Sequence, residues 1–196
     1  LDFEFDQKDV VFARIDRRRK IESTIILRAL GYDTKQILDL FYDNNTITIE
    51  KGNFFIDQKL DDLKGSIAPF DIKHKSKVIV QKGKRITIRH IESAKTSKMK
   101  HFQVPPEFLW GKRVCNDVID QSTGEVMLSC NQQITQELVE TILSSNLKKF
   151  EILHTNELDR GPFICNTLDI DPTTDQETAL IEIYRMMRPG EPPTKD

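Results

Sequence analysis

Apolar and polar side chains alternate in two stretches at the start of the chain. Residues 1–6 place leucine or phenylalanine at every odd position. After the polar residues 7–9, Val11, Ala13 and Ile15 alternate with Phe12 and Arg14. A period of two sends successive side chains to opposite faces of a strand. The pattern therefore predicts a β-hairpin.

Helical spacing of apolar residues follows this hairpin. Residues 21–30 predict a short helix that ends at Gly31, because glycine accepts the left-handed backbone found at helix C-termini. A second short helix is predicted to begin after Asp33 or Thr34, either of which can serve as its N-cap.

Short strands dominate the middle of the chain. The pattern predicts strands at 46–50, 54–58, 77–81 and 85–90, turns at 51–53 and 82–84, and a further hairpin around 121–124.

Two more helices are predicted after the strand-rich stretch. Thr135 is the expected N-cap of one of them, which carries a single apolar stripe over residues 138–143. Asp171 is the expected N-cap of the other, with Pro172 as its first residue and Pro189-Gly190 at its end. Its predicted buried face consists of Ala179, Leu180, Ile183, Tyr184 and Met187.

Composition narrows the possible functions. The chain has 196 residues, of which 38% are hydrophobic and 31% charged, and its formal net charge is −2. DNA phosphates favour strongly basic domains, so a self-sufficient DNA-binding module is disfavoured and nucleic-acid contacts must come from local clusters.

Three cysteines without a close pair favour a reducing compartment, by default the cytoplasm. No apolar run reaches the roughly 18 to 20 residues of a membrane helix. The first residue, Leu1, is not methionine, which indicates a cut inside a longer chain.

Motifs for metal binding and catalysis are weak. The four histidines share no ligand spacing with the cysteines, which disfavours zinc. Asp169, Asp171, Asp175 and Glu177 superficially suggest calcium, but Pro172 interrupts them and no turn glycine is present, so helix capping is the better interpretation. The sequence predicts no catalytic residue, cofactor-binding residue or metal ligand in this chain.

Two long strings carry a resemblance to a known family. One is RIDRRRK at 14–20, which runs into TIILRALGY at 24–32, and the other is IYRMMRPGEPPT at 183–194. Both resemble signature segments of the β subunit of bacterial DNA-directed RNA polymerase. NELDRGP at 156–162 and LDIDPT at 168–173 also fit this family.

The resemblance implies a fold and a domain division. Residues 1–41 and 160–196 would form one discontinuous domain of mixed helices and strands, the second β lobe. Residues 42–159 resemble a lineage-specific insertion of proteobacterial-type β subunits and would form a separate β-rich subdomain. The expected fold class is therefore α+β. The order of elements points to the same division, because helical segments bracket the strand-rich middle.

The resemblance also implies that the basic run after the first hairpin contacts DNA. Asp16, Arg17 and Arg18 would lie near the non-template strand at the start of the transcription bubble, where guanidinium groups bind phosphate oxygens. A strand alternates its faces, so the four cations at 17–20 are not expected to matter equally. The sequence alone leaves an alternative open, namely a solvated and charged strand end.

Arg188 is the other predicted DNA contact. Proline cannot continue a helix, so residues 189–193 should form a stiff, exposed loop that resembles the family's gate loop. Arg188 would then contact single-stranded DNA. It could also stabilise the C-terminal end of the helix dipole, and the two roles are compatible.

The implied function belongs to the whole polymerase. That enzyme makes RNA on a DNA template with Mg²⁺, whose ligands lie elsewhere in the family, so this chain is expected to be non-catalytic and to line the DNA cleft. Expected partners are DNA, the β′, α, ω and sigma subunits, and transcription factors at the insertion. The protein should be cytoplasmic and nucleoid-associated, without a membrane partner.

Two alternatives belong to other classes. One is a stand-alone nucleic-acid-binding module. The other is a protein-interaction module, in which an exposed Trp110 could mark a docking site, although this residue is most simply explained by packing. In that case, deletion of 42–159 should preserve RNA synthesis and abolish the effect of a regulator.

Overall fold

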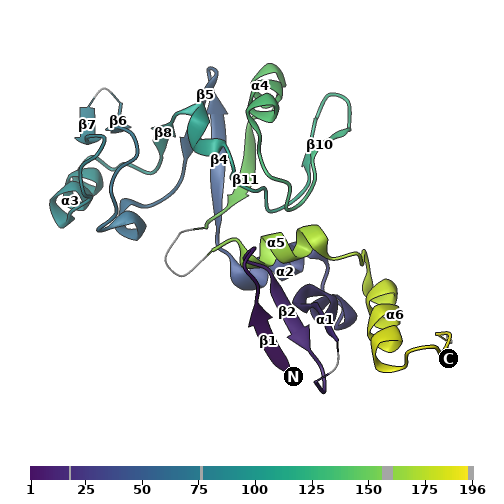
Figure 1. Cartoon of the computed structure of the whole chain (residues 1–196). Helices are drawn as coiled ribbons and strands as arrows, with labels where there is room; N and C mark the ends of the chain where they lie inside the picture. The colour runs from purple at the N-terminus through teal and green to yellow at the C-terminus, as the bar shows by residue number, and fades with distance from the viewer. Residues whose placement is uncertain (18, 76, 156–160, 194–196) are drawn as a thin grey trace. The chain divides into compact units, whose positions relative to one another are not determined.

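The computed structural model describes residues 1–17, 19–75, 77–155 and 161–193 (Figure 1). The chain forms two compact units. We call Leu1–Asp43 together with His154–Asp196 the terminal unit, and Asn44–Leu153 the central unit. Both contain helices and antiparallel strands, which confirms the predicted α+β class.

The terminal unit begins with the predicted hairpin. Its three antiparallel strands are β1 (Asp2–Phe5), β2 (Val11–Arg14) and β3 (Lys20–Glu22), in that order. Val11 and Ala13 are buried, whereas Phe3 and Phe5 on the edge strand β1 are largely exposed. The hairpin prediction is confirmed, and β2 supplies its buried side chains.

Four helices complete the described part of the terminal unit. Asp33 caps α2 as one of the two predicted N-caps, since its side chain accepts a hydrogen bond from the Gln36 amide. The predicted N-cap of the last helix, Asp171, is wrong. Asp175 caps that helix instead, by accepting from the Thr178 amide. The helices are α1 (Ser23–Ala29), α2 (Thr34–Phe41), α5 (Phe163–Ile170) and α6 (Gln176–Met187).

Buried polar contacts join the two sequence segments of the terminal unit. Arg28 on α1 forms an ion pair with Asp171 at 3.3 Å, and their side chains are only 7% and 0% exposed. Thr24 donates a hydrogen bond to the same carboxylate at 2.6 Å. The hydroxyl of Tyr42 donates to the Gly161 carbonyl at 2.9 Å. Asp171 therefore anchors α1 rather than starting a helix.

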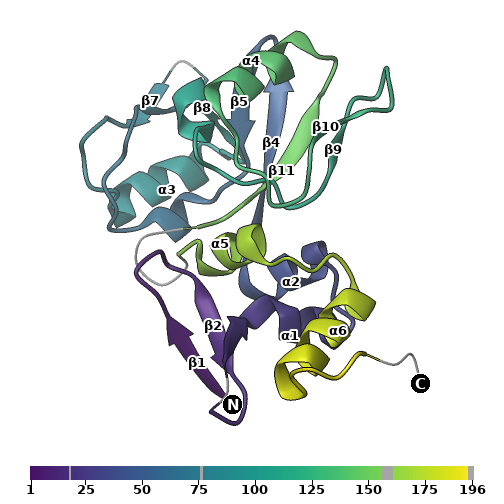
Figure 2. The same ribbon diagram turned by 45° about the vertical axis from the view of Figure 1, so that its right-hand side comes forward.

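Helix α6 is less buried than its apolar pattern predicts. It packs along α1, and the two helices lie side by side in both Figure 1 and Figure 2. Ala179 is fully buried, but Leu180 is 51% exposed and the other predicted core positions are only partly covered. The helix ends at Met187, as Pro189-Gly190 predicts.

A four-stranded antiparallel sheet forms the centre of the central unit. Its strand order is β11-β4-β5-β8, so the last strand in sequence pairs with the first. Ile47, Phe54 and Phe150 lie in its apolar core. The strands are β4 (Asn44–Glu50), β5 (Asn53–Ile56), β8 (Phe102–Val104) and β11 (Lys149–Leu153).

Two small hairpins and two helices surround this sheet. The hairpin predicted around 121–124 is confirmed by the pair β9 and β10, and Thr135 caps α4 as predicted. The remaining elements are η1 (Leu60–Leu63), β6 (Ile72–His74), β7 (Lys77–Val80), α3 (Ile88–Thr96), η2 (Pro106–Leu109), β9 (Val118–Ile119), β10 (Val126–Leu128) and α4 (Gln136–Ser144).

The strand predicted at 85–90 is wrong. Helix α3 begins at Ile88, and β7 pairs with β6 instead. Thr87 and His90 form a capping box, and Ile91 and Ala94 bury one helical face. The apolar residues at 86 and 88 alternate like those of a strand, but the buried pair that follows has helical spacing. Among the described helices, none is both long and apolar enough to cross a membrane.

Candidate nucleic-acid interface

The segment after β2 begins with a turn at Asp16 and Arg17. Asp16 and Arg17 have left-handed backbone conformations, with φ of 50° and 55°, and both are exposed. Arg18, a predicted DNA contact, lies outside the described residues. Strand alternation therefore does not govern the directions of Asp16 and Arg17, because the next strand begins only at Lys20.

Two cations of the three-stranded sheet are held by intramolecular contacts. Arg14 forms an ion pair with Glu4 across β1 and β2 at 3.1 Å. The hydrogen bond lowers the pKa of the Glu4 carboxyl and raises the pKa of Arg14. The Lys20 ammonium lies 4.3 Å from the centre of the Phe12 ring, a favourable cation–π distance. These contacts orient both side chains on the sheet.

Arg188 follows the last residue of α6 and is exposed. Its side chain is 64% exposed and forms a surface ion pair with Glu191 at 3.4 Å. Its guanidinium also lies 5.9 Å from the centre of the Tyr184 ring. Surface ion pairs contribute only about 0–1 kcal/mol, so this contact leaves Arg188 able to exchange Glu191 for another anion.

A groove of about 520 Å³ lies between the start of β3 and the end of α6. Both sequence strings that resemble a polymerase contribute to its wall. Arg185 also forms an ion pair with Glu182 at 3.0 Å on this wall. The lining residues are Arg19, Lys20, Ile21, Glu22, Ile25, Pro172, Glu182, Arg185, Met186 and Pro189.

The structure brings the flanks of the predicted contacts together. Arg19 and Lys20 are the last two cations of the predicted run, and Arg185 and Pro189 bracket Arg188. Sequence reasoning selected Asp16, Arg17, Arg18 and Arg188 as DNA contacts. It did not select Arg19, Lys20 and Arg185, the cations that line the groove. The sequence held one signal for Arg185, which lies three positions before Arg188, because positions three apart on a helix are neighbours. The DNA contacts of the selected residues stay predictions.

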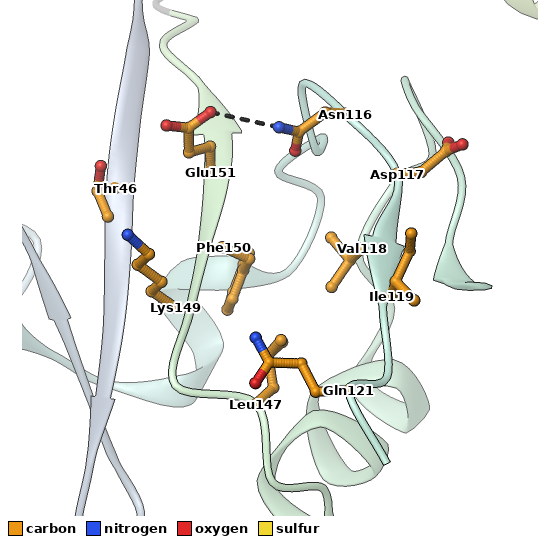
Figure 3. Close-up of a pocket in the computed structure, with 10 residues that line it drawn as sticks. All are labelled: Thr46, Asn116, Asp117, Val118, Ile119, Gln121, Leu147, Lys149, Phe150 and Glu151. Atoms are coloured by element: carbon orange, nitrogen blue, oxygen red, sulfur yellow. Dashed lines mark hydrogen bonds between the residues drawn. The ribbon is translucent and has the colours of Figure 1, made fainter. Parts of the chain in front are cut away.

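A second hollow lies within the central unit, between β11 and β9 (Figure 3). Its volume is about 300 Å³. Phe150 and Val118 contribute apolar surface to it, and Lys149 lies on β11 beside them. The Asn116 amide donates to the Glu151 carboxylate at 3.4 Å. The hollow therefore combines apolar side chains with charged side chains of both signs.

The other candidate positions of the sequence have plainer roles. Asp175 caps a helix, as the capping interpretation predicts, and Asp171 accepts the buried hydrogen bonds of Thr24 and Arg28. Trp110 is 44% exposed, so it lies at the surface of the central unit. In the described ranges, histidine, cysteine and carboxylate side chains form no group of three that could hold a metal ion.

Comparison with known families bears on the first half of the chain. The family described as RNA polymerase Rpb2, domain 2, matches residues 1–99. The match includes the basic turn, the start of β3 and helix α1, and it extends into the central unit. It confirms the resemblance to a polymerase β subunit and leaves the lineage of the insertion a prediction. The chain belongs to the RNA polymerase Rpb2 domain 2 family, whose members are parts of DNA-directed RNA polymerase.

Proposed function

We propose that the terminal unit lines the DNA cleft of a DNA-directed RNA polymerase and holds downstream and non-template DNA. The groove between β3 and α6 is the observation that carries this proposal, because it unites two cationic segments that are distant in sequence. The family match supports the polymerase assignment.

The chemistry of the groove fits a sugar–phosphate backbone. Arg19, Lys20 and Arg185 line it, and Arg17 is exposed in the preceding turn. Guanidinium groups bind phosphate oxygens in bidentate fashion, and such contacts position a nucleic acid without reading its sequence. Arg185 is paired with Glu182 only at the surface, where an ion pair is weak, so a phosphate can take the place of the Glu182 carboxylate.

The proposed role is positional rather than catalytic. The parent enzyme transfers nucleotidyl groups with Mg²⁺, and we expect groups outside this chain to hold the metal. In this role the chain works together with DNA and with the β′, α, ω and sigma subunits, in the cytoplasm and at the nucleoid.

Charge removal in the assembled polymerase tests the proposal. Arg19→Ala and Arg188→Ala should each shorten the lifetime of open promoter complexes about twofold to fivefold, the effect of one exposed ionic contact. The effect should shrink as salt rises, because salt screens exposed charges. Lys35→Ala, which removes an exposed cation paired with Asp39, is the matched control. Unchanged lifetimes for both arginine variants at several salt concentrations would contradict the proposal.

A second candidate function concerns the central unit. We propose that it offers a docking surface for a transcription factor, and the hollow beside β11 supports this idea because apolar side chains and charges adjoin there. Exposed apolar surface with a polar rim is typical of protein interfaces.

Removal of the central unit separates this function from DNA binding. A polymerase whose β subunit lacks 44–153 should still synthesise RNA on a simple template, and it should lose its response to a regulator that docks there. A loss of RNA synthesis in a correctly assembled enzyme would contradict this division of roles. Ile119→Arg, which places a charge in the hollow, is the milder variant and should reduce the same response.

A further inference from the structure

Positive charge is concentrated in one part of the central unit. Residues 59–101 contain twelve lysines and arginines against four aspartates and glutamates, although the whole chain has a net charge of −2. All twelve cationic side chains are exposed. A local excess of this size is the kind of cluster through which an acidic chain can bind a polyanion.

Backbone pairing draws part of this stretch into a single surface. The Ala68 amide donates to the Lys84 carbonyl at 2.9 Å, and the Gly65 amide donates to the Ile86 carbonyl at 2.9 Å. The segment after η1 is thereby fixed against the segment that leads into α3. Lys64 and Arg89 line one shallow hollow, Lys84 lines another, and His90 lines both.

We name this surface the basic patch and define it by Lys64, Lys84, Arg85, Arg89 and His90. Arg85 is anchored, since its guanidinium donates to the Gly65 carbonyl at 2.8 Å. Arg89 lies in the first turn of α3, where the positive end of the helix dipole adds to the potential. The patch therefore presents cations from three segments of the central unit to the same solvent region.

The composition of the patch selects among polyanions. Proteins that bind single strands stack the bases on exposed aromatic rings. The phenylalanine of this stretch, Phe70, is instead half-buried and packs against Phe102 and Phe108. Basic surfaces without aromatic platforms suit the phosphates of a duplex, which are contacted independently of sequence.

We propose that the basic patch binds the backbone of double-stranded DNA, as a contact separate from the groove of the terminal unit. The contact is electrostatic and independent of sequence, and it acts on duplex outside the melted region. An acidic protein segment and a single strand are the competing ligands that the test must exclude.

Site-specific photo-crosslinking in the whole polymerase tests proximity. Ile88 adjoins the patch and is 56% exposed, and Val126 is a matched apolar position, 52% exposed, on the hairpin β9–β10. A photoreactive residue at 88 should crosslink to duplex DNA in polymerase–DNA complexes, and one at 126 should not. Equal crosslinking at both positions, or crosslinking from 88 only to protein or to single strands, would overturn the proposal.

Charge neutralisation tests the energetics. The triple variant Lys64→Gln, Lys84→Gln and Arg89→Gln should lower the salt dependence of binding to promoter-free duplex DNA. Each lost phosphate contact reduces the slope of log K against log salt by about 0.9, so the expected decrease is about 2 to 3. The control triple variant replaces Lys8, Lys51 and Lys148, which are exposed cations outside the patch, with glutamine.

The comparison of the two triple variants decides the matter. A larger loss for the patch variant, with the response to Arg19→Ala retained, supports a contact separate from the groove. Equal losses in both triple variants would show that only net charge matters. Binding of a polyglutamate peptide that the patch variant abolishes, with DNA binding unchanged, would assign the surface to an acidic protein.

Discussion

Arg28 and Asp171 are charged residues inside the terminal unit, and each depends on the other. Their side chains are almost completely excluded from solvent, and Thr24 and Thr34 add hydrogen bonds to the pair. Removing two ions from water is costly, so a buried pair is tolerated only where hydrogen bonds satisfy it well. Loss of one partner leaves the other charge buried and unpaired.

Asp171→Ala should therefore lower the free energy of unfolding by about 3–5 kcal/mol, the usual cost of an uncompensated buried charge. Urea unfolding followed by circular dichroism measures this change. Lys35→Ala, which breaks the exposed pair with Asp39, should change it by no more than about 0.5 kcal/mol. Similar losses for the two variants would contradict the buried role of Asp171.

At single residues, the sequence indicated which side chains are chemically important, but not which partners they contact or which backbone conformation they adopt. It chose Asp171 as a helix cap because aspartate before proline is a common helix start. In the structure that carboxylate binds Arg28, which lies 143 positions earlier in the chain. No local sequence pattern reveals a partner at such a separation. The cationic run was similarly visible, but its left-handed turn was not, since neither Asp16 nor Arg17 is a glycine.

Helix α6, which packs against α1, has one small residue as its buried position. Ala179 is fully buried, and the next residue, Leu180, is largely exposed. The periodic pattern assigned both residues to one buried face. An α-helix completes a turn about every 3.6 residues, and two consecutive residues therefore point in clearly different directions. Where the buried face of a helix is narrow, one of the two faces solvent.

Ala179→Leu should destabilise the terminal unit by about 1–3 kcal/mol, because a larger side chain overfills the fully buried space around this position. Leu180→Ala should change the free energy of unfolding by no more than about 0.5 kcal/mol, as expected of an exposed position. Thermal or urea unfolding checks both values. A greater loss for Leu180→Ala than for Ala179→Leu would show that the helix faces are reversed.

Among whole elements, predictions held where pattern and cap agreed. Helices α2 and α4 had both, and the structure contains them. The first hairpin, predicted from alternation around a polar turn, is also present. The stretch 85–90 had an alternating pattern in conflict with a helical one, and the helix prevails because Ile91 and Ala94 bury its face. The groove required α6 to return beside β3, which is a tertiary arrangement beyond local patterns.

For the molecule as a whole, the two junctions between the units lie side by side. The His154 amide donates to the Asp43 carbonyl at 2.8 Å, so the chain leaves and re-enters the terminal unit at neighbouring points. A short turn can bridge such ends, since two-residue connections close paired strands. A chain in which Asn-Gly replaces 44–153 should therefore retain a folded terminal unit.

Cooperative urea unfolding of this shortened chain provides the structural check on the deletion proposed for the polymerase. Asp171→Ala within it should again cost about 3–5 kcal/mol, which shows that the buried pair has formed. A shortened chain without a cooperative transition would mean that the central unit supports the fold of the terminal unit.

The ion pair between Arg28 and Asp171 can form only late during synthesis of the chain, because its two residues lie in different halves of the terminal unit. The ribosome must make the 110 residues of Asn44–Leu153 between the two halves of the terminal unit. At about 5–20 residues per second, the first half waits roughly 5–20 s for its partner. Throughout that interval Arg28 stays solvated and the apolar faces of α1 and α2 remain uncovered. The nascent terminal half is then a natural substrate for chaperones, whereas the central unit is synthesised without interruption.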